Sequence, residues 1–127
     1  MDNENNNKSR FFSFKIACWG LRHAISSQRN FRIQILIGIV VLIAAWFFKF
    51  SRIEWLILIL TIGLVLASEL INTVVEVVVD LAVKEQLIPD AKIAKDVSAA
   101  AVLLMSAFAA LIGLILFIPH LGQINLF

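Results

Sequence analysis

The chain has 127 residues, of which 61% are hydrophobic and 16% are charged, and its formal net charge is +2. Soluble domains average about 45–50% apolar and about 25% charged residues, so this composition excludes an ordinary soluble domain. The small net charge, with no basic run interleaved with aromatic residues, argues against nucleic-acid binding. The single cysteine, Cys18, excludes an internal disulfide framework. We therefore expect one membrane domain covering residues 1–127.

The N-terminal segment, at about residues 10–28, is only moderately apolar. At about 100° per residue, Lys15, Arg22 and Arg29 share one helical face, while aromatic residues such as Trp19 lie elsewhere. This pattern predicts an amphipathic helix on the membrane surface, with basic side chains reaching lipid phosphates. The alternative is an ordinary amphipathic helix packed against the rest of the protein, and the two interpretations are compatible.

Three apolar segments follow, at about residues 31–50, 53–84 and 96–118. At about 1.5 Å per residue, twenty helical residues match a hydrocarbon core of about 30 Å, so each segment is long enough to cross a bilayer. The second segment is longer than the core, and we expect its C-terminal turns to extend into the cytoplasm. The third is rich in alanine, serine and glycine, which allow helices to pack closely in lipid. The predicted fold is an all-α membrane protein with one surface helix and three transmembrane helices.

The distribution of basic residues predicts the orientation of these helices. Lysines and arginines gather in the N-terminal segment and in the second loop, between residues 84 and 95, and the C-terminal tail has none. By the positive-inside tendency, the N-terminus and the second loop are cytoplasmic and the C-terminus lies outside.

Four polar residues in the second span, Glu69, Asn72, Glu76 and Asp80, are spaced at i, i+3, i+7 and i+11. On a helix they form a stripe about 80° wide. Ionisable groups at membrane depth are costly and usually mark a functional site. The alternative is a polar seam that holds helices together, which Asn72 alone would fit. Three carboxylates fit it poorly, because like charges repel unless a cation or protons intervene.

The stripe also indicates which chemistry the site could perform. Magnesium prefers oxygen ligands and commonly takes one or two carboxylates together with substrate phosphates, a role open to Glu76 and Asp80 near the cytoplasmic edge. Glu69 lies deeper and is the candidate general base. Lys95, at the start of the third span, could neutralise transferring phosphate oxygens. Such a site suits a lipid hydroxyl that meets a water-soluble phosphate donor, although the chain has no GxxxxGK[ST] loop.

The run ELINTVVEVVVD at 69–80, followed by AKD at 94–96, resembles the bacterial membrane diacylglycerol kinase and undecaprenol kinase family. The resemblance extends to WGLR at 19–22 and NFR at 30–32, so it covers nearly the whole chain. It implies a homotrimer in the bacterial inner (plasma) membrane that transfers the γ-phosphate of ATP to a lipid alcohol. It also implies Mg²⁺ as the cofactor and active sites shared between subunits.

The resemblance implies roles for individual residues. The acid matching Glu69 is the catalytic base, supported by Asn72, and the acid matching Glu76 binds magnesium. Gln28 stands where the family usually has a second metal-binding acid, and its amide oxygen could coordinate magnesium without adding charge. The implied nucleotide contacts are Arg10, Asp80, Glu85, Gln86, Lys95 and Asp96, and the implied lipid contacts are Asn30, Phe31 and Arg32.

We therefore predict an ATP-dependent lipid kinase, with diacylglycerol as the expected substrate and undecaprenol as the alternative. A rival hypothesis from another class is a non-catalytic membrane protein whose buried acids carry ions or protons, a common use of such acids. Against this rival, the acids cluster toward the cytoplasmic edge of the span instead of its midplane. Cys18, His23 and His120 have no partner at ligand spacing, and we expect no chemical role for them.

Overall fold

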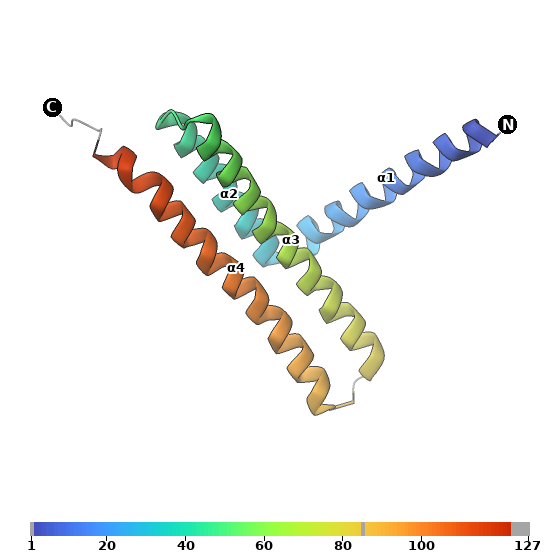
Figure 1. The fold of residues 1–127 in the computed structure, drawn as a ribbon. Helices are drawn as coiled ribbons and strands as arrows, with labels where there is room; N and C mark the ends of the chain where they lie inside the picture. Colours follow the sequence, from blue (N-terminus) through green and yellow to red (C-terminus); the bar gives the residue numbers. More distant parts are fainter. Residues whose placement is uncertain (1, 85, 123–127) are drawn as a thin grey trace.

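The structure is a computed structural model that describes residues 2–84 and 86–122, with side chains described from residue 6 onward. It is all-helical, and its elements are α1 (Asp2–Ser27), α2 (Arg29–Phe47), α3 (Arg52–Val83) and α4 (Pro89–Leu121). Figure 1 shows α2, α3 and α4 as a bundle from which α1 projects at an angle. Helices α3 and α4 form an antiparallel hairpin whose closed end extends beyond the start of α2 (Figure 1).

Helices α2, α3 and α4 are all long and apolar enough to cross a membrane. This confirms the prediction of three long apolar helices, and each helix begins and ends at other residues than predicted, with the largest differences at the end of α2 and the start of α4. Helix α2 ends at Phe47, three residues before the predicted end, because Lys49 adopts a left-handed backbone conformation with φ 55° and turns the chain. Helix α4 begins at Pro89, earlier than the predicted span, because proline suits the first helical position, where no backbone N–H is needed.

Helix α1 meets the bundle only near its C-terminal end. Among its described side chains, Ala24 is the buried one and the others are exposed. The elbow to α2 is held by Arg32, whose Nη1 donates to the carbonyl oxygens of Ile25 at 3.2 Å and Ser26 at 2.8 Å. A cation at a helix C-terminus satisfies carbonyls that have no intrahelical partner. The position of α1 on a membrane surface stays a prediction.

The turn from α2 to α3 is fixed by a capping box at the start of α3. The backbone N–H of Glu54 donates to the hydroxyl of Ser51, and the Glu54 carboxylate accepts from the Ser51 N–H at 2.7 Å. Two orphan N–H groups of the first helical turn are thereby satisfied. The same carboxylate lies 2.7 Å from Nε2 of His120 near the end of α4. His120, for which the sequence predicted no partner, therefore links the outer ends of α3 and α4.

The hydrophobic core also lies at this end of the bundle. Its buried residues, Ala45, Phe50, Leu58 and Leu116, come from α2, the turn, α3 and α4. The ring of Phe50 stacks on His120 with a centroid distance of 4.8 Å. The best-packed part of the chain is thus the end opposite the closed turn of the α3–α4 hairpin.

Candidate active site

The polar stripe of α3 follows a gradient of burial toward the closed end of the hairpin. Glu69 and Asn72 are buried, with only 4% and 7% of their surface exposed. Glu76, one turn farther along, is partly buried, and Asp80 is exposed. A single helix therefore carries carboxylates from a water-poor to a water-rich environment.

Two side-chain amides hold the inner carboxylates. Nε2 of Gln34 on α2 donates to Oε2 of Glu69 at 3.0 Å, and Nδ2 of Asn72 donates to Oε1 of Glu76 at 3.2 Å. The second bond pairs Asn72 with Glu76, whereas the resemblance implied that Asn72 supports Glu69. Sequence reasoning missed Gln34, although it is the only polar residue in the apolar run 33–47 and so carried a usable signal.

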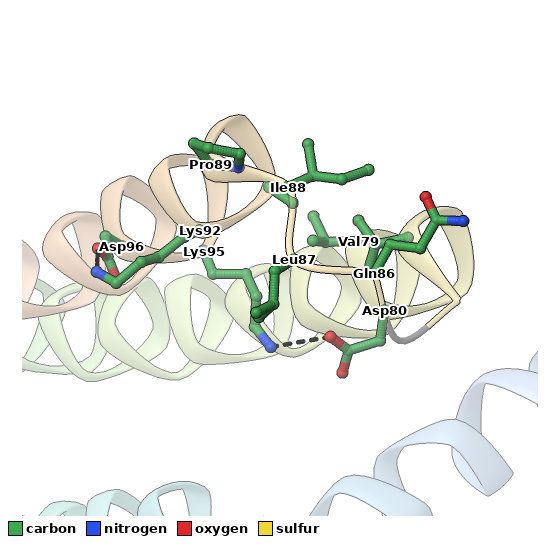
Figure 2. A pocket seen from close by; sticks show the side chains of 11 residues that line it. Val79, Asp80, Gln86, Leu87, Ile88, Pro89, Lys92, Lys95 and Asp96 are labelled. Carbon is green, nitrogen blue, oxygen red and sulfur yellow. Dashed lines mark hydrogen bonds and ion pairs between the residues drawn. The ribbon is translucent and has the colours of Figure 1, made fainter.

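The closed end of the α3–α4 hairpin forms an open cavity of about 560 Å³. Figure 2 shows Nζ of Lys95 reaching across from α4 to Oδ1 of Asp80 on α3, a distance of 2.9 Å. Lys92 pairs with Asp96 on α4 itself. The positive charges of Lys92 and Lys95 thus offset the negative charges of Asp96 and Asp80 in the cavity wall. Lys95 donates this hydrogen bond to Asp80, and the Asp80 carboxylate stabilises the charge of the Lys95 ammonium.

The other predicted nucleotide contacts are not gathered at this cavity to the same degree. Gln86 lines it, but Figure 2 shows its amide pointing away from Lys95. Glu85 lies outside the described residues. Arg10 precedes the end of α1 by 17 residues, about 25 Å of helix, on the element that projects from the bundle (Figure 1). Within one chain, Arg10 therefore lies apart from the cluster on α3 and α4.

The predicted lipid contacts lie at the elbow between α1 and α2. Asn30 is exposed, Phe31 is the largest fully buried side chain, and the guanidinium of Arg32 is engaged by the carbonyls of α1. Gln28 is the N-cap of α2 without a side-chain capping bond. No hydrogen bond joins Gln28 to Glu76 among the described side chains, so their joint metal-binding role stays a prediction.

The oxygen atoms around Glu76 fit a hard divalent cation. Oδ1 of Asn72 is buried and has no hydrogen-bond partner among the described residues, while Nδ2 of the same amide donates to Glu76. A carboxylate beside an unpartnered amide oxygen matches the preference of magnesium for one or two protein oxygens supplemented by phosphates and water. Within residues 2–84 and 86–122, no group of three His, Cys, Asp or Glu side chains is arranged to hold a metal. The donor set therefore suits an ion shared with a phosphate ligand better than a closed protein cage.

A family model described as prokaryotic diacylglycerol kinase matches residues 15–117. A diacylglycerol kinase of Synechocystis sp. is 43% identical over 109 residues, which are 86% of this chain and 62% of the relative. An undecaprenol kinase of Bacillus subtilis is 38% identical over 117 residues, which are 91% of this chain and 94% of the relative. The match thus spans less than two thirds of the Synechocystis relative and nearly all of the Bacillus relative.

Proposed function

We propose that this chain, which belongs to the prokaryotic diacylglycerol kinase family, transfers the γ-phosphate of ATP to the hydroxyl of a lipid alcohol in a bacterial membrane. The observation that carries the proposal is the order of groups along α3. Buried Glu69 comes first, partly buried Glu76 next, and exposed Asp80, paired with Lys95, last. This order matches a reaction in which one substrate arrives from the lipid and the other from water.

In this mechanism the lipid hydroxyl oxygen attacks the γ-phosphorus, the bond from phosphorus to the bridging oxygen breaks, and ADP leaves. The hydroxyl proton passes to Glu69, whose Oε1 accepts no hydrogen bond from any described residue. The Lys95 ammonium, now bonded to Asp80, would exchange that partner for phosphate oxygens and stabilise their charge. Positioning and electrostatic stabilisation are the main contributions a protein makes to phosphoryl transfer.

Glu76, the unpartnered oxygen of Asn72 and the amide of Gln28 are the residues that would hold Mg²⁺. When bound, the ion would supply positive charge that offsets the negative charge of the phosphate oxygens. The role of Asn72 is then twofold, because its Nδ2 orients the Glu76 carboxylate while its Oδ1 is available as a donor atom.

The proposed assembly is a homotrimer with the N-terminus in the cytoplasm, α1 on the membrane surface and sites shared between subunits. Two features support self-association. In a single chain Glu76 is only partly buried and Asp80 is exposed, and α4 carries small residues at 98–101, 106–107 and 109–110. Small side chains permit the close helix contacts by which membrane helices associate.

The proposed substrate is diacylglycerol, and undecaprenol is the second candidate. The Synechocystis relative is named for the first lipid and the Bacillus relative for the second. Coverage supports undecaprenol, because the match includes 94% of the Bacillus relative, whereas sequence identity, 43% against 38%, supports diacylglycerol. Both lipids present one hydroxyl at the membrane surface, so the same arrangement of base and cation can serve either.

The test is a lipid panel with γ-labelled ATP and purified protein in mixed micelles. The panel contains diacylglycerol, undecaprenol, no lipid, and triacylglycerol as a matched control whose hydroxyl is blocked. We expect label in one of the two alcohols, together with ATP consumption that depends on that lipid. Absence of labelled lipid from a correctly assembled protein would refute kinase activity and favour the non-catalytic hypothesis. If undecaprenol is the one lipid that becomes labelled, the substrate is undecaprenol and not diacylglycerol.

A further inference from the structure

Gln34 is the one polar side chain between Ile33 and Phe47 of α2. An amide in a membrane-spanning segment is costly unless it finds a hydrogen-bond partner. Gln34 finds its partner in Glu69, 35 positions away, at 3.0 Å. Among the described residues this is the one side-chain hydrogen bond that joins α2 to α3. The polar group of α2 is thus tied to the candidate base.

The bond restricts the orientation of the Glu69 carboxylate. A hydrogen bond from an N–H to an ionised oxygen is roughly twice as strong as one between neutral groups. It commits Oε2 and leaves Oε1 to accept a proton. Glu69 is 4% exposed, so little water competes with the amide for that oxygen.

The carbonyl oxygen of the Gln34 amide lacks such a partner among the described residues. Gln34 lines a partly open cavity of about 370 Å³ between α2, α3 and α4, and the rest of the lining is mostly apolar. Its Oε1 is buried and accepts no hydrogen bond in the part of the chain that the structure describes. An unsatisfied buried acceptor costs stability, so helix packing alone is a poor reason to have glutamine here.

We propose that Gln34 is a positioning residue that holds the Glu69 carboxylate in the orientation needed for proton transfer. The inference rests on the proposed function, in which Glu69 is the base. Gln34 acts through Glu69 and does not itself contact the transferring phosphate.

The first test compares Gln34→Leu with Thr61→Val. Leucine keeps the approximate size of glutamine and removes the donor. Thr61 lines the same cavity, and its hydroxyl donates only to its own helix, to the carbonyl of Ile57 at 2.7 Å, so Thr61→Val is the matched control. We expect Gln34→Leu to lower kcat by about 10- to 100-fold, the typical effect of a misplaced catalytic group, with the KM for ATP unchanged. A KM for ATP that changes as much as kcat, or a kcat equal to that of the control, would overturn the proposal.

The second test places Gln34→Leu in a Glu69→Gln background. If Gln34 acts only through the base, the double variant should be no slower than Glu69→Gln alone, so the two effects are strongly non-additive. A further drop of the same size as in the parent would show that Gln34 acts independently of Glu69.

A third measurement does not depend on turnover. In ¹⁵N spectra of the detergent-solubilised protein, the Gln34 side-chain amide should shift on Glu69→Gln and stay in place on Thr61→Val. If the parent phosphorylates no lipid alcohol while this shift is present, the proposed function fails and the Gln34–Glu69 contact stands. If the resonance does not respond to Glu69→Gln, the positioning proposal fails whether or not the parent is active.

Discussion

The most direct prediction concerns Glu69→Gln, which removes a proton acceptor and almost nothing else. Glutamine has the shape of glutamate, and its side-chain oxygen can still accept the hydrogen bond that Nε2 of Gln34 now donates at 3.0 Å. The buried site should therefore keep its packing. An amide cannot serve as the base, and loss of a general base typically slows a reaction by 10²- to 10⁴-fold. That range corresponds to about 2.7–5.5 kcal/mol of transition-state free energy.

ATP binding should survive this substitution. Asp80, which pairs with Lys95 at the hairpin cavity, is eleven residues beyond Glu69, about 16 Å along the helix. We expect kcat in the labelled-ATP assay to fall by the predicted range while nucleotide affinity, measured by equilibrium binding, stays within twofold. Asp90→Asn, which removes an exposed carboxylate from the start of α4, is the control and should match the parent. Turnover by Glu69→Gln within a few-fold of the parent would refute the assignment of the base.

Three further predictions concern the metal, the assembly and helix packing. Gln28→Glu should lower the magnesium concentration that gives half-maximal rate by up to roughly tenfold, if the added carboxylate contributes ~1.4 kcal/mol; an unchanged half-point in a titration at fixed ATP would place residue 28 outside the coordination sphere. Mixing inactive Glu69→Gln and Glu76→Gln subunits should restore part of the activity if sites are shared, and no recovery in exchanged oligomers would argue for single-chain sites. Gly38→Val should lower stability by about 1–3 kcal/mol, because a Cβ there would meet Cγ2 of Ile62 at 3.2 Å; an unchanged Tm would contradict the close packing of α2 on α3.

The sequence predicted those features that depend on local pattern. The length of each apolar run predicted three spans, and the period of 3.6 residues predicted that Glu69, Asn72 and Glu76 share one face of α3. The gradient of exposure from Glu69 to Asp80 then follows from the direction of the helix, since each turn carries the stripe nearer the closed end of the hairpin.

Long-range pairs were the part that the sequence did not reveal. Gln34 lies 35 positions from Glu69, and His120 lies 66 positions from Glu54. Such contacts depend on the rotation and offset of one helix against another, and neither is visible in the periodicity of a single helix. Arg32 illustrates the converse case: it belongs to a motif that suggested a substrate contact, yet within one chain the carbonyls of α1 already engage its guanidinium.

The helices pack tightly at one end of the bundle, and the polar stripe of α3 becomes exposed at the other. Near the end of α2, Phe50, Leu58 and Leu116 pack together. At the same end, His120 on α4 contacts Glu54 at the capped start of α3. These contacts hold the helices together and involve none of the candidate site residues. At the other end, the α3–α4 hairpin continues past the start of α2, and Asp80 stays exposed (Figure 1). In the proposed mechanism, the carboxylate that meets the soluble phosphate donor needs access to water, whereas the base that meets the lipid needs shelter from it. Because the stabilising contacts lie at the far end, the stripe on α3 can satisfy both needs without weakening the packing of the helices.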